Sequence, residues 1–475
     1  MITIVGGGLA GSEAAWQAAS LGVPVTLYEM RPVRATAVHQ TDRLAELVCS
    51  NSFRGDKLDN AVGLLKEEMR RLGSLVMRAA EASRVPAGAA LAVDRVRFSE
   101  EITGALGSHP LVTIVRDEVV AIPRATEHEP VIIATGPLTS DALSADLARL
   151  VGAEHLSFYD AISPIVLADS IDRAKVFRAS RWDRSIQLRP DPAHDATAPA
   201  CGADDGEGDY LNCPMTREEY ERFFDALIHA ESATVHDFDK EKFFEGCLPI
   251  EVMAHRGHDT LRFGPMKPIG LTDPRTGRSP YAAVQLRQDN LAGDHYSLVG
   301  FQTQLKWSEQ ARVLRLIPGL EEAEFVRFGI VHRNTYVNGP MVLAETWQVR
   351  KHPAVLFAGQ MSGVEGYVES AASGLLAGVN AARMVRGEPL AVAPRTTAIG
   401  ALAFYVSHAN PAHYDPSNIT FGIIEPLSGA PRGKLARKLA ISARALADLG
   451  RWRDGLRDGP KAVADTDPLE TVARR

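Results

Sequence analysis

Three glycines near the start of the chain follow a G-x-G-x-x-G spacing: Gly6, Gly8 and Gly11. They come directly after the apolar run 2–5 and open a helical pattern over 10–21. In such a unit one glycine makes the strand-to-helix turn, one lets the backbone approach a pyrophosphate, and one lets the helix pack closely on the strand. The helix N-terminus then offers unpaired N–H groups to the phosphates. The spacing therefore predicts a β-α unit that binds a dinucleotide.

An acidic residue stands where such a unit contacts the ribose. Residues 23–28 are predicted to form the second strand, and Glu29 ends it, 18 residues beyond Gly11. A carboxylate there can accept hydrogen bonds from ribose hydroxyls. The alternative is an ordinary strand-turn-helix whose glycines serve packing alone. We favour dinucleotide binding, and the predicted contacts are Gly6, Gly7, Gly8, Leu9, Ala10, Gly11 and Glu29.

Two later segments indicate which dinucleotide is bound. Residues 131–136 and 354–358 are apolar and predicted to be buried strands, and the second is followed by Gly359, Gln360 and a small-residue helix over 368–386. In two-part flavoproteins a late strand returns to the first sheet, so that the next helix meets the flavin. A nicotinamide-only domain does not need this strand. The pattern favours FAD over NAD and adds Gly359 and Gln360 to the predicted contacts.

The length and the order of these segments predict the organisation of the chain. With 475 residues the chain can form two or three cores. The aromatic-rich middle region differs from the flanking sheet segments, and its stretch 191–209 is predicted to be a mobile loop. We predict an α/β fold with a Rossmann-like FAD-binding domain of the GR2 type and an inserted α+β substrate domain. The expected parts are 1–150 (FAD-binding, first part), 151–325 (insertion), 326–440 (FAD-binding, second part) and 441–475 (basic C-terminal helix and tail).

Composition excludes several classes of protein. No basic and apolar leader precedes the first strand, and no stretch approaches the roughly 18 apolar residues that span a bilayer. Four dispersed cysteines without a C-x-x-C pair suggest neither a disulfide framework nor zinc. A net charge of −7 argues against indiscriminate nucleic-acid binding. We expect a cytoplasmic protein with reduced thiols that holds no metal and binds neither membranes nor DNA.

Two cysteines are candidates for chemistry. Cys49 and Cys213 lie in polar, turn-prone surroundings, and each has an arginine nearby in the sequence. A thiol acts as a nucleophile in its thiolate form, which requires partial exposure and nearby donors or positive charge. The alternative is an inert, buried thiol. Cys247 is predicted to lie in a core and Cys201 in the predicted loop, so neither is given a role.

Two segments are rich in basic residues. One covers 173–189 and includes Trp182, and the other covers 432–453 and includes Trp452. Phosphate contacts come from Lys and Arg, and unstacked RNA bases pack on aromatic rings. An RNA-facing surface is therefore one interpretation, and an ordinary solvated face is the other.

Six motifs along the chain resemble those of one family. They are GGGLAGSEAA at 6–15, EMRP at 29–32, VCSNS at 48–52, LNCPM at 211–215, FGPMKP at 263–268 and AGQ at 358–360. Together they resemble the folate- and FAD-dependent tRNA (uracil-5-)-methyltransferases, the TrmFO family. The combination is specific where each motif alone is not. A longer family that modifies the tRNA wobble uridine shares the glycine fingerprint, but this chain is too short for its C-terminal helical extension.

The resemblance implies methylation of C5 of the T-loop uridine (position 54) of tRNA. The carbon would come from 5,10-methylenetetrahydrofolate, and the electrons would come from reduced FAD and ultimately from NADPH or NADH. Uracil C5 is a poor nucleophile until a thiolate adds to C6. By resemblance Cys213 is the attacking thiol and Cys49 the acceptor of the C5 proton. His332, Asn334 and Tyr336 are expected to bind folate.

Two other functions remain open from the sequence. A flavin-dependent thiol oxidoreductase would use Cys49 and Cys213 as a redox pair, although the C-x-x-C that such enzymes commonly carry is missing. A non-catalytic RNA-binding flavoprotein would need neither cysteine. Gln360 stands where many flavoproteins have an acidic residue that contacts the ribitol of FAD, so it weakens the argument from flavoproteins in general. The family that this chain resembles uses glutamine at that place.

Overall fold

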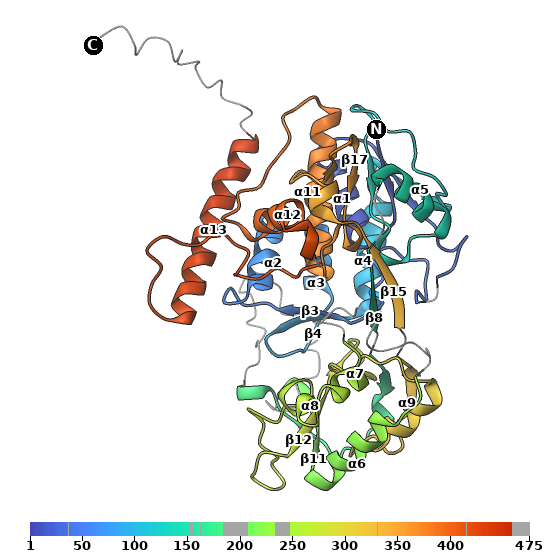
Figure 1. Ribbon diagram of the computed structural model, residues 1–475, viewed down its shortest axis with the longest axis vertical. Coiled ribbons are helices and arrows are strands. Elements are labelled where there is room, and N and C mark those ends of the chain that lie inside the picture. Colours follow the sequence, from blue (N-terminus) through green and yellow to red (C-terminus); the bar gives the residue numbers. More distant parts are fainter. Residues whose placement is uncertain are drawn as a thin grey trace.

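The computed structural model describes residues 1–36, 38–152, 156–161, 163–183, 208–232, 248–329, 331–414 and 416–457. Within these ranges the chain forms two bodies, each built on a six-stranded sheet (Figure 1). The predicted loop 191–209 lies outside the described residues except for its last two, and Cys201 and Cys247 also lie outside them.

The first sheet has the parallel topology predicted for a dinucleotide-binding domain. Its order is β16 (Gln348–Val349), β17 (His352–Phe357), β7 (Val131–Ile133), β1 (Ile2–Val5), β2 (Val25–Glu29) and β6 (Val112–Arg116). All neighbouring strands are parallel except β16 and β17. The strand predicted near 354–358 therefore returns to the first sheet and pairs with β7, which pairs with β1. The Rossmann-like α/β prediction is confirmed.

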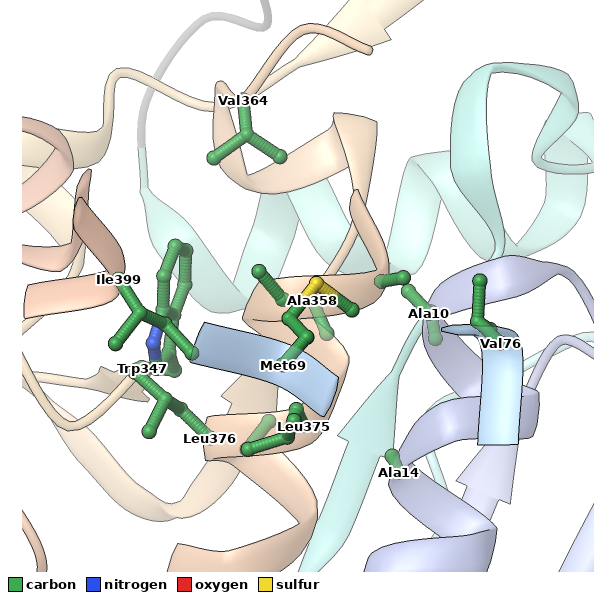
Figure 2. Close-up of a cluster of buried hydrophobic side chains, with 14 of the residues drawn as sticks. Ala10, Ala14, Met69, Val76, Trp347, Ala358, Val364, Leu375, Leu376 and Ile399 are labelled. Carbon is green, nitrogen blue, oxygen red and sulfur yellow. The ribbon is translucent and has the colours of Figure 1, made fainter. Parts of the chain in front are cut away.

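Helices α1 (Leu9–Ser20) and α11 (Tyr367–Val385) cross in close contact beside this sheet (Figure 1). A Cβ on Gly374 would overlap the carbonyl oxygen of Ala10, and a Cβ on Gly378 would overlap that of Ala14. These two glycines are one helical turn apart, so they line one face of α11. Figure 2 shows the small side chains of Ala10 and Ala14 beside the α11 segment that carries Leu375. Small residues on both helices thus allow their backbones to approach.

Further helices surround α11 and complete this core. Met69, Trp347 and Ile399 pack around it and are at most 1% exposed (Figure 2). A buried carboxylate joins two of these helices: Glu68 accepts hydrogen bonds from the first two backbone N–H groups of α12 (Ala398–His408), at 2.8 Å each. The other elements of this body are α2 (Ala61–Arg71), α3 (Leu75–Ala82), α4 (Arg95–Gly107), α5 (Asp141–Val151), α10 (Gly339–Val342), α12 (Ala398–His408), α13 (Lys434–Arg457) and a small sheet of β3 (Ser52–Gly55), β5 (Ala90–Val93) and β4 (Arg84–Val85).

The second sheet is antiparallel and has its own core. Its order is β10 (Phe177–Arg178), β11 (Tyr210–Met215), β12 (Ala282–Gln288), β13 (His295–Leu298), β9 (Ile165–Leu167) and β14 (Phe325–Arg327). Buried side chains such as Tyr220, Phe223 and Leu261 pack in the core of this body, and they come from its helices. Those helices are α6 (Arg217–Ile228), α7 (Ile250–His255), α8 (Thr260–Phe263) and α9 (Trp307–Leu314).

Two antiparallel strands connect the bodies. β8 (Leu156–Ala161) and β15 (Val331–Tyr336) pair along their whole length and lie side by side between the two parts of Figure 1. The chain enters the second sheet after β8 and leaves it before β15, which is the topology of an insertion. The four-part division of the chain stays a prediction. Within the described ranges, no helix is both long and apolar enough to cross a membrane.

Candidate functional site

The glycine turn has the local geometry that the sequence predicted. Gly6 adopts a φ of 105°, a conformation that favours glycine, and turns the chain between β1 and α1. A Cβ on Gly11 would overlap the carbonyl oxygen of Gly6, so Gly11 permits the close packing of helix and strand. Gly8 faces open space, since no heavy atom beyond its two chain neighbours lies within 4 Å of the position that a Cβ on it would take. The turn and packing roles are confirmed, and Gly8 leaves room for a ligand.

A cavity opens at the carboxyl ends of the parallel strands. Its walls are the residues that directly follow β1, β2, β7 and β17, which is where open α/β sheets bind ligands. Thr135 and the short 3-10 turn Gly136–Leu138 form one wall. Of the nine predicted FAD contacts, the cavity is lined by all but Gly11: Gly6, Gly7, Gly8, Leu9, Ala10, Glu29, Gly359 and Gln360.

The Glu29 carboxylate is held by four donors. It accepts the N–H of Gly7 at 3.1 Å and three N–H groups of Arg31, the shortest from Nε at 2.8 Å. Burial by itself would raise the pKa of Glu29, but the hydrogen bonds and charge of Arg31 outweigh it and hold this pKa below its ordinary value. Glu29 is therefore ionised. Sequence reasoning missed Arg31, although it belongs to the EMRP motif.

A histidine that the sequence did not single out also lines the cavity. The Nδ1 atom of His39 lies 2.7 Å from the Thr36 hydroxyl oxygen. Burial, followed by the positive charge of Arg31, lowers the pKa of His39 to about 4. The imidazole is therefore neutral near pH 7 and can both donate and accept a hydrogen bond.

Cys49 directly follows Val48, which lines this cavity. It is half-buried in irregular structure, as predicted. The hydroxyl of Tyr367 accepts the backbone N–H groups of Cys49, at 2.8 Å, and of Ser50, at 3.0 Å. Tyr367 is the first residue of α11, and it lines the cavity together with Val48. The cysteine loop is thus attached to the helix that follows Gly359 and Gln360.

Two arginines fasten the same loop from both bodies of the molecule. Arg95, from α4, donates through Nη1 to the carbonyl of Leu47 at 2.9 Å. Arg287, from β12 of the second sheet, donates through Nε to the side-chain oxygen of Asn51 and through Nη2 to the hydroxyl of Ser50, both at 2.8 Å. The loop is therefore a joint between the two bodies, and its position depends on both.

A third arginine adds positive charge at this joint. Arg95, Arg287 and Arg327 of β14 each interact electrostatically with the Cys49 thiol. Burial lowers the pKa of Arg287 and of Arg327. The Nε and Nη2 atoms of Arg327 are buried without a hydrogen-bond partner among the described residues. Since buried donors are normally paired, these atoms fit an anionic or oxygen-rich ligand.

Cys213 does not lie in a loop, and that prediction is wrong. It occupies the middle of β11, opposite Val284 of β12, and its side chain is 0% exposed. Burial, followed by the negative charge of Glu321, raises the pKa of its thiol well above the ordinary value. Leu211, Cys213 and Met215 alternate along the strand and all enter the core of the second body. This period of two was the sequence signal for a buried strand.

The predicted folate residues are placed only in part. His332 and Asn334 belong to β15, but their side chains lie outside what the structure describes. Tyr336 is 3% exposed, and its ring lies 6.3 Å from that of Tyr414. It does not line the cavity described above. Across the described ranges, no group of three or more His, Cys, Asp or Glu side chains is arranged to hold a metal ion.

Comparisons with known proteins place the chain among its relatives. The family model "Glucose inhibited division protein A" matches residues 1–389. Proteins named methylenetetrahydrofolate–tRNA-(uracil-5-)-methyltransferase TrmFO match nearly the whole chain. The one from Pelotomaculum thermopropionicum is 56% identical and covers 96% of this chain and 99% of its own. The one from Symbiobacterium thermophilum is 57% identical, with 96% and 97% covered. This chain belongs to the TrmFO family.

A solved structure shares the fold of this TrmFO chain. Aquifex aeolicus GidA, in its form I crystal, aligns with a TM-score of 0.69 and 19% sequence identity. The alignment covers 95% of this chain and 75% of GidA, so a quarter of GidA has no counterpart here. At this identity the likeness concerns the fold alone. The family membership rests on the relatives above 50% identity, and it favours the TrmFO interpretation over a thiol oxidoreductase or a wobble-uridine enzyme.

Proposed function

We propose that this chain is a methylenetetrahydrofolate-dependent tRNA (uracil-5-)-methyltransferase that acts on the T-loop uridine (position 54). Its relatives at 55–57% identity carry this name over 94–96% of the chain. The observation that carries the proposal from the structure is the attachment of the Cys49 backbone to Tyr367, a residue that lines the dinucleotide cavity. Chemistry at C5 of uracil requires a group that accepts the C5 proton, and Cys49 is proposed for that role.

The cavity fits FAD. Gly8 leaves open space beside the N-terminus of α1, where N–H groups can bind a pyrophosphate. We propose that the ionised Glu29 accepts the ribose hydroxyls, with Arg31 keeping its charge, and that Gly359 and Gln360 hold the flavin end. The Gln360 amide is oriented by a 2.9 Å hydrogen bond to Glu365. When bound, reduced FAD would supply the electrons that convert the transferred methylene to a methyl group.

The two thiols have separate roles in this proposal. Addition of a thiolate to C6 of uracil forms an S–C6 bond and moves the ring electrons onto O4, which makes C5 nucleophilic. After C5 has gained its carbon, loss of the C5 proton and cleavage of the S–C6 bond restore the ring. We keep Cys213 as the attacking thiol and Cys49 as the proton acceptor. Since Cys213 is fully buried in the described conformation, its role requires the second core to open when tRNA binds.

The carbon donor and the reductant complete the proposal. We propose that methylenetetrahydrofolate enters on the side of β15 and that NADPH or NADH binds transiently, because the sequence holds one glycine fingerprint. His332 and Asn334 remain proposed folate residues. Because Tyr336 is buried against Tyr414, we propose that it supports the folate site by packing.

Product analysis tests the activity. The purified, flavin-loaded protein is incubated with unmodified tRNA, methylenetetrahydrofolate and NADPH, and the nucleosides are analysed for 5-methyluridine. We expect this product only when folate is present. A folded, flavin-loaded protein that yields no 5-methyluridine would reject the activity.

Trapping tests the thiol roles. An RNA with 5-fluorouridine at the target position retains the enzyme adduct, because fluorine cannot leave as the C5 proton does. We expect Cys213→Ala to abolish the adduct and Cys49→Ala to retain it. The reverse result would make Cys49 the attacking thiol, in agreement with its exposure in the structure.

A further inference from the structure

A second hollow lies at the start of α13, outside the cavity already described. Phe421 and Gly422 form one side, and Lys434, Arg437 and Lys438 line the other. The three basic residues are spaced i, i+3 and i+4, so they share one face of the helix. The Lys438 ammonium lies 5.5 Å from the centre of the Phe421 ring.

The positive charge of this hollow is not compensated. Within the described ranges, Lys434, Arg437 and Lys438 form no ion pair, whereas Arg451 and Arg453 farther along α13 pair with Asp448 and Asp454. The first turn of α13 contains no acidic residue. Like charges on one helix face repel one another. In a chain of net charge −7, this local excess favours an anionic partner.

The hollow is connected to the Cys49 site by a short series of contacts. The segment that leads to Phe421 lies against the start of α11, where the N–H of Ile419 donates to the Glu369 carboxylate at 2.9 Å. Glu369 also pairs with Arg54, which lies five residues after Cys49. These contacts link the segment that carries Phe421 to the start of α11 and to β3, which follows the Cys49 loop.

A second contact ties α13 to the same region. The hydroxyl of Ser442 donates to the carbonyl of Leu58 at 2.7 Å, between β3 and α2. Figure 1 shows α13 lying beside α2. The basic face is thus fixed relative to the candidate site and does not belong to a free tail.

We propose that the hollow formed by Phe421, Lys434, Arg437 and Lys438 binds the sugar-phosphate backbone of the tRNA substrate. This inference rests on the proposed function, because it takes tRNA as the substrate. Phosphates are contacted by Lys and Arg, and the Phe421 ring offers a surface for a ribose or an unpaired base. The contacts would position the RNA without reading its sequence.

The test compares two triple variants of the full-length, flavin-loaded protein. The first is Lys434→Ala, Arg437→Ala and Lys438→Ala. The control is Arg124→Ala, Arg149→Ala and Lys351→Ala. This variant also loses three positive charges, but from a different region, near α5 and the start of β17. Binding of unmodified tRNA is measured by fluorescence anisotropy at several salt concentrations, without folate. Flavin content and thermal unfolding are measured on both variants.

We expect the first variant to bind tRNA about tenfold more weakly. The plot of log K against log salt concentration should also be less steep, its slope smaller in magnitude by about 2 to 3, because each phosphate contact contributes roughly 0.9 to that slope. The control should bind as the unchanged protein does. Unchanged affinity and slope in the first variant, or an equal loss in the control, would overturn the proposal. If the first variant lost affinity for anionic lipid vesicles but kept its affinity for tRNA, the hollow would be a membrane-binding surface, and the proposal would also be overturned.

The two proposals fail in different ways. The binding measurement needs neither folate nor turnover. If the protein forms no 5-methyluridine but the first variant still loses tRNA affinity, the activity is rejected and the surface stands. If the methyl group is transferred and the first variant binds normally, the surface is rejected and the activity stands.

Discussion

The hydroxyl of Tyr367 accepts hydrogen bonds from the backbone N–H groups at the Cys49 loop, 2.8 Å from the nitrogen of Cys49 itself. Tyr367 begins α11, and α11 packs on α1, which begins at the glycine turn. A single side chain therefore couples the candidate thiol to the helix pair that shapes the cavity.

Removing this acceptor should weaken the site. In Tyr367→Phe two N–H groups, at Cys49 and Ser50, lose their partner, and we expect a loss of about 1–3 kcal/mol in the free energy of unfolding. Methyl transfer should fall with it. Urea unfolding and turnover are the measurements, and Tyr281→Phe in the second body is the matched control. Equal stability of the two variants would contradict the assigned role.

The glycine turn offers a pair of alanine variants with different expected outcomes. Gly8 faces open space, so Gly8→Ala should fold normally and lose affinity for FAD by at least about tenfold, because its methyl group enters the cavity where the phosphates approach. In Gly11→Ala the methyl group overlaps the Gly6 carbonyl, and we expect destabilisation of about 1–3 kcal/mol or more from overpacking. Thermal unfolding of the flavin-free proteins and FAD titration separate the two effects. A stable Gly11→Ala protein would show that the turn can relax.

The pKa of His39 predicts sensitivity to acid. This pKa is about 4 in the folded protein and near 6.5 ordinarily, so between these values the unfolded chain binds more protons. His39 therefore makes stability rise as pH increases from 4 to 6.5 and fall on acidification over the same range. Urea unfolding between pH 4 and 7 should show that the free energy of unfolding depends less steeply on pH in His39→Gln than in the unchanged protein. The exposed His128→Gln is the control, and an unchanged slope in His39→Gln would exclude this histidine as a source of the dependence.

The burial of the two thiols predicts their reactivity. Without tRNA, iodoacetamide should alkylate the half-buried Cys49 readily, whereas the 0% exposed Cys213 should react only as fast as the second core opens. Peptide mass spectrometry follows both sites, and labelling in urea, where both react, provides the reference. Rapid alkylation of Cys213 in the folded protein would show that its core opens without RNA.

The local pattern of the sequence was enough to predict the dinucleotide half of the fold. The spacing of Gly6, Gly8 and Gly11 describes a turn whose geometry depends on residues close in sequence, and the buried strands near 131 and 354 are apolar runs that parallel sheets require. Cys213 shows the limit of this reasoning. Its neighbours Asn212 and Pro214 suggested a loop, yet the alternation of Leu211, Cys213 and Met215 was satisfied by a core built from distant strands.

The sequence by itself thus determined the cavity, because strand, turn and helix follow from short-range periodicity and from the backbone freedom of glycine. Tertiary structure alone decided which of the two thiols has its backbone attached to a residue that lines that cavity. Cys49 is placed by Tyr367, 318 residues away, and its loop is fastened by Arg287 through Asn51, 236 residues away. Contacts over such separations depend on how two cores pack together, and no local pattern encodes that.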